Sequence, residues 1–230
     1  MKRTYNTLML GILLMISAVV KAQIIDNYGI RIGAGLSDEY WNYKTFNLDE
    51  EGWQGNKISF TGQVFAEKYL GKYLSILPAI GYIQKGYVDD IKWVALDGSP
   101  VEITTVNNRV VFHDLSMDVS FKIMPFQKKI KPYLLLGLRG DYLMDYRGVI
   151  VNFQGENLEL NKDLYNDYNK FTLGGILGAG ISYHELLFMD LEYNPSITKN
   201  FDSSFMAIHD SYFSLSMGMN INQLIKARNE

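Results

Sequence analysis

Charged side chains recur at alternate positions along several stretches of this chain that are otherwise rich in apolar residues. Because alternate residues of a β-strand face the same way, these charges lie on the face opposite to their apolar neighbours. Such charges, gathered on one enclosed face, can form ion pairs or pass protons. We expect a structural network of ion pairs, with a conducting pore or a proton path as the alternative. The ten residues are Arg31, Glu67, Lys85, Asp114, Asp118, Lys122, Arg139, Asp141, Asp190 and Glu192.

A second set of residue types that could do chemistry is the run His209-Asp210-Ser211. These are the types of a hydrolytic triad, but adjacent residues of a strand point apart, which is poor geometry for a proton relay. His113 and His184 stand far from this run in sequence. No metal-ligand spacing occurs, and the glycine-rich segments are not followed by a helix start, as a phosphate loop would require. We therefore expect no catalytic residue, no metal and no cofactor.

The segment that best shows which elements position these charges is 131–145, KPYLLLGLRGDYLMD. Read with a period of two, one face is almost wholly apolar, whereas the other carries Arg139 and Asp141. A helix would scatter these charges around its cylinder. The run is also about twice the usual length of a soluble strand, and a strand that crosses a bilayer needs about 9–11 residues. It is therefore predicted to be a transmembrane strand with its apolar face toward lipid.

Seven further segments alternate in the same way, so the sequence predicts an all-β protein, a transmembrane up-and-down antiparallel barrel of about eight strands. The connections alternate between long and short, as in outer-membrane barrels. A soluble lipocalin also has about eight strands, but its interior is apolar, whereas here the inward set is small or charged. The expected strands are 28–36, 57–68, 73–86, 110–123, 131–145, 171–183, 187–198 and 211–221.

Within this barrel, position along each strand sorts the charges by depth. Arg31, Asp118, Arg139 and Glu192 are expected near the middle, where Asp118 and Arg139 lie on adjacent strands and could pair directly. The remaining charges fall toward one end or the other. Lys85, Asp114 and Asp141 are expected toward the outside, and Glu67, Lys122 and Asp190 toward the periplasm.

Residues 1–22 have the three parts of a secretory signal: a positive start, an apolar run at 8–20, and small residues before a cleavage site after Ala22. A membrane anchor helix is the less favoured alternative, because the run is shorter than the roughly 20 residues of a span. We expect a signal peptide at 1–22, a barrel at 23–221 and a polar tail at 222–230. The chain has no cysteine, which excludes a lipoprotein anchor, and its net charge of -3 does not favour nucleic acid.

Three further expectations concern particular residues. Pro78 should cost a ladder hydrogen bond or force a bulge, and Asp97-Gly98 predicts the turn of a hairpin above the membrane. Aromatic residues near strand ends should form the interfacial girdles: Tyr28, Tyr73, Tyr87, Tyr133, Tyr142, Tyr183 and Tyr193. Large side chains in the long loops are candidates for contact with partners: Trp41, Trp53, Trp93 and Phe153.

Three short motifs resemble the PorT-like outer-membrane β-barrel family: LSILP at 74–78, YIQKG at 82–86 and IKPYL at 130–134. The resemblance covers most of the chain after the signal segment, and it implies an eight-stranded outer-membrane barrel without an assigned catalytic residue. The chain departs from the family pattern at Pro78-Ala79, at 115–119, which lacks a proline, and at the polar residues after Ile221.

Together these features predict a bacterial outer-membrane protein that acts as a structural or interaction scaffold through its outer loops. A lipid-modifying enzyme that uses His209 or His113, and a small pore, remain the alternatives. The partners expected are outer-membrane lipid and lipopolysaccharide, the barrel assembly machinery during insertion, and envelope proteins or external ligands at the loops. No nucleic acid is expected.

Overall fold

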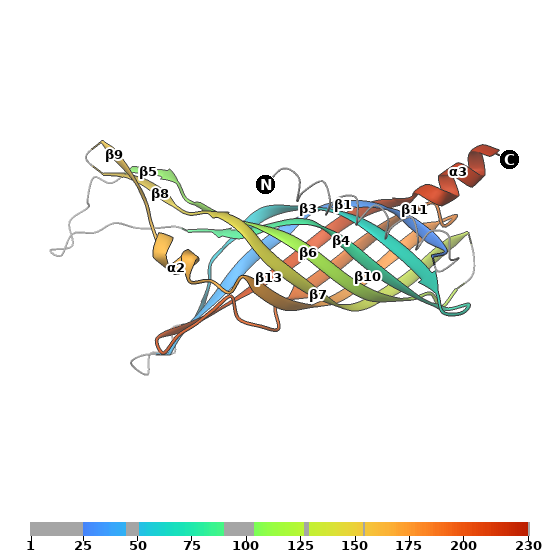
Figure 1. Cartoon of the computed structure of the whole chain (residues 1–230), viewed down its shortest axis with the longest axis horizontal. Helices are drawn as coiled ribbons and strands as arrows, with labels where there is room; N and C mark the ends of the chain where they lie inside the picture. Colours follow the sequence, from blue (N-terminus) through green and yellow to red (C-terminus); the bar gives the residue numbers. More distant parts are fainter. Residues whose placement is uncertain (1–24, 45–50, 90–103, 127–128, 154, 230) are drawn as a thin grey trace, which may run out of the picture.

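A computed structural model describes residues 25–44, 51–89, 104–126, 129–153 and 155–229. Long strands wrap around one axis and close into a barrel, with a small sheet and a short helix beyond one end and a helix at the other (Figure 1). Each long strand is antiparallel to both neighbours in the order β13-β11-β10-β7-β6-β4-β3-β1. The eight are β1 (Asn27–Tyr43), β3 (Gly55–Tyr69), β4 (Leu74–Val88), β6 (Arg109–Ile123), β7 (Ile130–Arg147), β10 (Phe171–Tyr183), β11 (Leu187–Pro195) and β13 (Met206–Asn220).

The barrel closes where β1 pairs with β13, in a register that runs from Gly29 opposite Asn220 to Tyr43 opposite Met206. Closure leaves none of these eight strands as an open edge, which is what a sheet needs in order to cross a lipid bilayer. The expectation of an all-β, up-and-down antiparallel barrel of eight strands is confirmed.

The side chains of the barrel wall alternate as the sequence predicts. On β7, Leu134, Leu136 and Leu138 are 54–63% exposed on the outside, while Leu135 and Arg139 are buried inside. The same alternation on the other strands places a belt of aliphatic and aromatic side chains around the outer wall. A water-soluble protein buries such residues, so this belt is the surface that faces lipid.

The two ends of the barrel differ in the length of their connections. Three short turns join β3 to β4, β6 to β7 and β10 to β11; the last contains His184 and Glu185, both with positive φ. Long connections at the opposite end carry further elements. Because short turns of outer-membrane barrels face the periplasm, the long connections are extracellular. They hold β2 (Glu51–Trp53), β5 (Thr104–Asn107), β8 (Ile150–Phe153), β9 (Glu156–Glu159), α2 (Lys162–Asn166) and β12 (Phe201–Asp202).

A separate sheet of three strands in the order β5-β8-β9 stands beyond the outer end of the barrel (Figure 1). The turn predicted at 97–98 lies outside the described residues. The described strand nearest to it, β5, pairs with β8.

Several sequence expectations need correction. Tyr87 and Tyr133 are buried inside the molecule and do not belong to a girdle. Ile221, expected to be the last residue of the final strand, instead begins helix α3 (Ile221–Asn229), which runs through most of the segment expected as a polar tail at 222–230; its residue Asn222 donates to the carbonyl of Asp26 at 2.7 Å. At Pro78, the β3–β4 pairing passes from Phe65 opposite Ala79 directly to Lys68 opposite Ile76, so the ladder has a gap there, as expected. Among the described residues, no helix is both long and apolar enough to cross a membrane.

Candidate functional site at the outer mouth of the barrel

The structure places all ten charged residues singled out from the sequence in the barrel lumen. Each comes from an inward-facing position of a long strand, and each is only 1–7% exposed. Because a buried charge without a partner is costly, the pairing of these residues determines what the lumen can do. They fall into two clusters, an inner one toward the periplasm and an outer one toward the long loops.

The inner cluster is centred on Arg31 of β1. Its guanidinium forms a close ion pair with Glu192 of β11, lies 3.5 Å from Asp190, and lies 3.7 Å from Asp118 of β6. Gln63 also accepts from Arg31 and donates to Asp118 at 2.7 Å. Four strands are thereby linked through one side chain.

Below Arg31, Lys122 lies 3.2 Å from Glu67 and sits over the ring of Tyr133 at 4.4 Å. The Tyr133 hydroxyl in turn hydrogen-bonds Asp190. Tyr133 therefore belongs to the lumen network, because its position on β7 shares the inward parity of Arg139. The alternation along the strand already predicted an inward-facing side chain at Tyr133, but because the residue is a tyrosine near a strand end, it was assigned to the girdle.

The direct pair that the sequence allowed between Asp118 and Arg139 does not form. The two residues are opposite each other on β6 and β7, but no ion pair joins them. Asp118 turns toward Arg31, whereas Arg139 turns outward to Asp141, whose oxygen lies 2.8 Å from its Nε. Each of the two residues thus pairs with an opposite charge other than its cross-strand neighbour.

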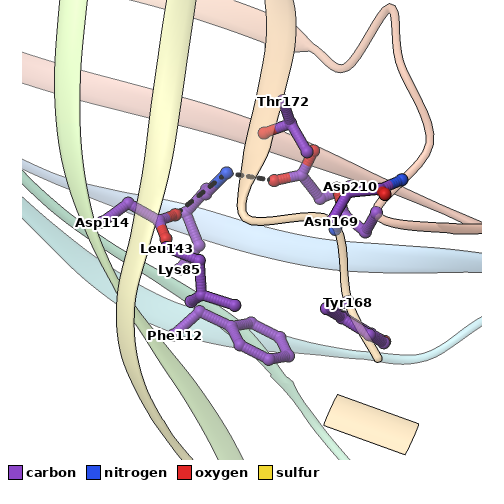
Figure 2. A pocket seen from close by; sticks show the side chains of 9 residues that line it. Lys85, Phe112, Asp114, Leu143, Tyr168, Asn169, Thr172 and Asp210 are labelled. Atoms are coloured by element: carbon purple, nitrogen blue, oxygen red, sulfur yellow. Dashed lines mark hydrogen bonds and ion pairs between the residues drawn. The ribbon is translucent and has the colours of Figure 1, made fainter. Parts of the chain in front are cut away.

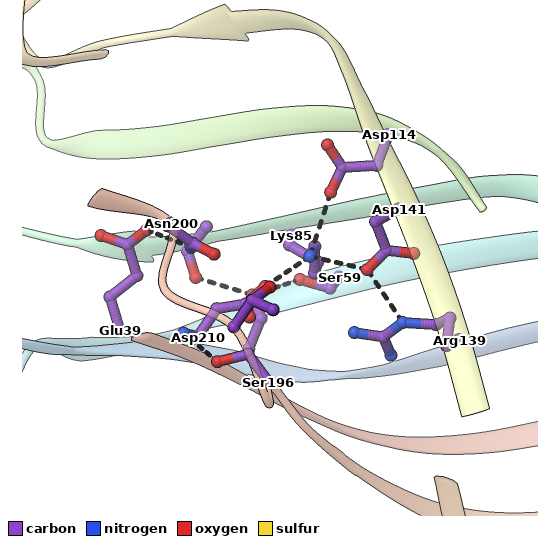
Figure 3. A network of polar contacts seen from close by, with 12 residues as sticks. Glu39, Ser59, Lys85, Asp114, Arg139, Asp141, Ser196, Asn200 and Asp210 are labelled. Atoms are coloured by element: carbon purple, nitrogen blue, oxygen red, sulfur yellow. Dashed lines mark hydrogen bonds and ion pairs between the residues drawn. The ribbon is translucent and has the colours of Figure 1, made fainter. Parts of the chain in front are cut away.

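The outer cluster surrounds the ammonium group of Lys85 on β4 (Figure 3). Lys85 contacts Asp141 at 3.0 Å, Asp114 at 3.2 Å, and Asp210 of β13 more closely. Asp210 was assigned from sequence only to a contiguous triad-like run. Its inward parity with Ser214 and Ser216 on β13 is the signal that could have placed it in the lumen.

A second group of buried residues, here called the aromatic cap, covers the outer mouth of the barrel. Tyr165 of α2 donates to or accepts from the hydroxyl of Tyr87 at 2.8 Å, and Tyr168 stacks on Phe112 with ring centroids 5.4 Å apart. This cap is a hydrophobic core outside the membrane belt, built from barrel ends and loops together. Its buried members are Trp41, Tyr87, Val110, Phe112, Leu143, Val149, Val151, Tyr165, Tyr168 and Ile208.

A small chamber lies between the outer cluster and the cap (Figure 2). Its volume is about 20 Å³, which is enough for one water molecule. Lys85, Asp114 and Asp210 line it from the lumen, and Tyr168 and Asn200 line it from the loops. One carboxylate oxygen of Asp210 and the amide oxygen of Asn200 are buried there without a hydrogen-bond partner.

The residues considered for catalysis do not converge. On β13, Asp210 points into the lumen, so its neighbours His209 and Ser211 point to the other face of the strand. His113 contacts the hydroxyl of Tyr82 at 2.5 Å on the outer wall. Among the described residues, no group of three or more His, Asp or Glu side chains is arranged to hold a metal ion.

The four loop residues proposed as contact points have different surroundings. Trp41 is 9% exposed and lies in the aromatic cap, so it cannot offer a contact surface while the cap is in place. Phe153 is 41% exposed at the end of β8. Trp53 belongs to β2, and Trp93 lies outside the described residues.

A closed antiparallel barrel with an apolar outer wall, a polar lumen and one end of short turns is a transmembrane β-barrel. Residues 22–202 match the family described as outer membrane protein beta-barrel domain, and this chain belongs to that family. The family places the protein in the bacterial outer membrane.

Three solved structures are similar in fold. Ail, the attachment invasion locus protein of Yersinia pestis, is 10% identical, with 84% of this chain and 98% of that chain covered and a TM-score of 0.36. OprG from Pseudomonas aeruginosa is 9% identical, with 85% and 96% covered and a TM-score of 0.45. Neisserial surface protein A is 12% identical, with 83% and 96% covered and a TM-score of 0.40. The comparison with curated proteins finds no match.

Proposed function

We propose that this chain is a non-enzymatic integral scaffold of the outer membrane that contacts partners through its outer sheet, β5-β8-β9. The observation that carries this proposal is the position of that sheet, which projects beyond the barrel (Figure 1) and is attached to it at its base. Val149 and Val151 are buried in the aromatic cap and fix the base. Loops held on a rigid scaffold are common sites of recognition.

Beside its buried base, the same face of this sheet offers an exposed apolar surface. Val151 is opposite Leu158, and Phe153 shares their face because alternate residues of β8 point the same way. Phe153 and Leu158 are 41% and 46% exposed, respectively. Exposed apolar side chains next to polar neighbours such as Asn152 and Asn157 are typical of protein contact sites.

The filled lumen favours a scaffold over a pore. Three cavities found along it among the described residues have volumes of about 20, 10 and 10 Å³, each no larger than about one water molecule. Charged side chains from the interior faces of seven of the eight strands, all except β10, and the aromatic cap occupy the remaining space. This supports the assignment of the inward charges to a structural plug.

The finer assignments form part of the same proposal. We infer that the chain belongs to the PorT-like group of these barrels and that residues 1–22 are removed as a signal peptide after Ala22. The proposed partners are outer-membrane lipid and lipopolysaccharide around the belt, the assembly machinery during insertion, and an envelope protein or external ligand at the outer sheet.

Site-specific photo-crosslinking in intact cells tests the scaffold function. A crosslinking amino acid at Phe153 or Leu158 should yield a discrete protein adduct, and the double substitution Phe153→Ser with Leu158→Ser should reduce adduct formation from a crosslinker at Asn157. A crosslinker at Leu70, which is exposed in a periplasmic turn, is the matched control. Equal adducts at Leu70 and at the sheet, or none at the sheet, would contradict the proposal.

Deleting residues 92–106 tests whether the loops are separable from the barrel. Among the described residues, the part of this segment in β5 pairs with β8 and with no barrel strand, so the deletion should leave a barrel that still shifts its electrophoretic mobility on heating. Loss of the folded, faster band would mean that the loop supports the barrel itself.

A further inference from the structure

The carboxylate of Glu39 lies where the aromatic cap meets the barrel. It belongs to β1, three residues beyond Leu36, the last exposed aliphatic residue of that strand, and it is 1% exposed. Three neutral donors converge on it: Trp41 Nε1 at 3.1 Å, the Tyr168 hydroxyl at 3.1 Å and Asn200 Nδ2 at 3.3 Å. They come from the barrel, from the segment after α2 and from the connection after β11, so one side chain joins three parts of the outer mouth.

The surroundings of Glu39 contain negative rather than positive charge. Asp210 is opposite it across the β1–β13 pair, and Asp38 precedes it, with Oδ1 accepting from the Glu39 amide. Among the described residues no cation forms an ion pair with Glu39. The cation beside Asp210 is Lys85, which already contacts three carboxylates: Asp114, Asp141 and Asp210. The other titratable groups of the cap, Tyr87, Tyr165 and Tyr168, are neutral phenols.

The unpartnered atoms beside Glu39 fit a protonated carboxyl group. Asn200 donates to Glu39 with Nδ2 and leaves Oδ1 buried without a donor. A half-turn of this amide would bring Oδ1 to Glu39, where a carboxylic acid proton satisfies it. Nδ2 would then face the chamber that Asp210 also lines, and Asp210 Oδ1 is itself without a donor. An ionised Glu39 has no proton to donate to Asn200 Oδ1, so the amide would not turn and Asp210 Oδ1 would gain no donor either.

We propose that Glu39 is a proton-binding site that fastens the cap to the barrel. With its proton, Glu39 joins Trp41, Tyr168 and Asn200 as a neutral group. When the proton leaves, the new negative charge faces Asp210 without a cation, so the loops that carry Tyr168 and Asn200 move away and the chamber opens to the outside.

The electrostatics agree with this geometry. Burial raises the pKa of Glu39 from 4.5 to about 8; the charge of Asp210 adds to this rise, and the three hydrogen bonds oppose it. Burial also raises the pKa of Tyr168 well above 10, so this phenol stays a neutral donor. The folded chain therefore keeps a proton between pH 4.5 and 8 that an unfolded chain releases. The closed cap should lose stability as pH rises through that window.

Trp41 provides the reporter, because its indole donates to Glu39. In full-length mature protein refolded in phosphatidylcholine vesicles, with Trp53→Phe and Trp93→Phe leaving Trp41 as the single tryptophan, quenching by acrylamide is measured from pH 5 to 10. We expect quenching to rise severalfold with a midpoint near pH 8. Glu39→Gln should remove the transition, and Glu159→Gln, which changes an exposed carboxylate of the outer sheet, should leave it unchanged.

Asp210→Asn keeps the test decisive if Glu39→Gln does not fold. Removing the facing negative charge makes ionisation of Glu39 easier, so the midpoint should move to lower pH. Heating-dependent electrophoretic mobility establishes that each variant is folded. A flat wild-type profile, a transition that survives Glu39→Gln, or a midpoint that Asp210→Asn leaves in place would each overturn the proposal.

Discussion

The inner and outer halves of the lumen hold the same kinds of residues but differ in how completely they are hydrogen-bonded. In the inner half, neutral side chains donate hydrogen bonds to the carboxylates, in addition to the ion pairs that the cations make. Tyr133 donates to Asp190, and Gln63 donates to Asp118 at 2.7 Å. Asn27 and Ser75 donate to Glu67 at 3.0 and 2.7 Å.

The outer half leaves several polar atoms without a partner. Among the described residues, seven buried side-chain atoms have no hydrogen bond, and only one of them, Asn220 Oδ1, is at the periplasmic end. The other six lie around the Lys85 cluster and the level just beneath it. They are Ser116 Oγ, Arg139 Nη1, Asp141 Oδ1, Asn200 Oδ1, Asp210 Oδ1 and Tyr212 OH.

This contrast indicates different tasks for the two halves. A buried polar network that is fully satisfied is rigid, and the inner half has the properties of a permanent plug. A network with open acceptors beside a water-sized chamber is ready to take up water or protons. The outer half, which adjoins the loops, is thus the part of the lumen that can respond to the outside.

The largest effect is expected from Arg31→Met in the inner half. This change leaves Glu192, Asp190 and Asp118 without their shared cation, so the free energy of unfolding should fall by about 3–5 kcal/mol. Urea titration in vesicles, followed by heat-modifiable mobility, measures it. Lys44→Met, which breaks a pair of exposed groups with Asp202, should cost less than about 1 kcal/mol. Equal losses would remove the distinction between a lumen plug and a surface pair.

A matched pair of aspartates separates the two halves more directly. Asp190→Asn replaces an acceptor used by both Arg31 and Tyr133, and should cost about 1–3 kcal/mol. Asp210→Asn removes one of three carboxylates around Lys85 and supplies a donor to an under-satisfied cluster, so its effect should stay within about 1 kcal/mol. The same urea titration compares them. A greater loss for Asp210→Asn would mean that the outer cluster is as fully optimised as the inner one.

The smallest effect is expected in the cap. Tyr168→Phe removes one hydrogen bond to Glu39 and should cost about 1 kcal/mol, felt mainly as faster proteolysis between β9 and β10. Tyr146→Phe removes an exposed bond to Asn166 and serves as the control, since water can replace that partner. Equal cleavage rates for the two variants would show that the Glu39 contact does not hold the cap.

The barrel could be predicted from sequence because its physical rule is local. A period of two, applied to 131–145, is enough to state which side chains face lipid and which face the lumen. Depth could be read as well, since the outer position of Lys85 and the inner position of Lys122 follow from counting along strands. The residue types on each face were sufficient to distinguish this barrel from a lipocalin.

The partners within the lumen could not be predicted in the same way. Asp118 and Arg139 are true cross-strand neighbours, but Asp118 pairs with Arg31 of β1, which only barrel closure brings near, and Arg139 pairs with Asp141 two residues along its own strand. The aromatic cap was missed for a related reason. Trp41, Tyr87 and Tyr168 come from three separate loops or strand ends, and nothing in their spacing shows that they share one core.

At the periplasmic rim, Asn222 of α3 reaches the start of β1, where its Oδ1 accepts from the amide of Tyr28 across 194 positions of sequence. The seam between the first and last strands is therefore locked by residues from opposite ends of the polypeptide. A partly synthesised or partly inserted chain cannot form these contacts between α3 and β1, and the edge of its first strand stays unpaired until the last strand is in place. Sealing is thus an all-or-nothing event that depends on contacts of the longest range, which favours slow and highly cooperative assembly over stepwise growth.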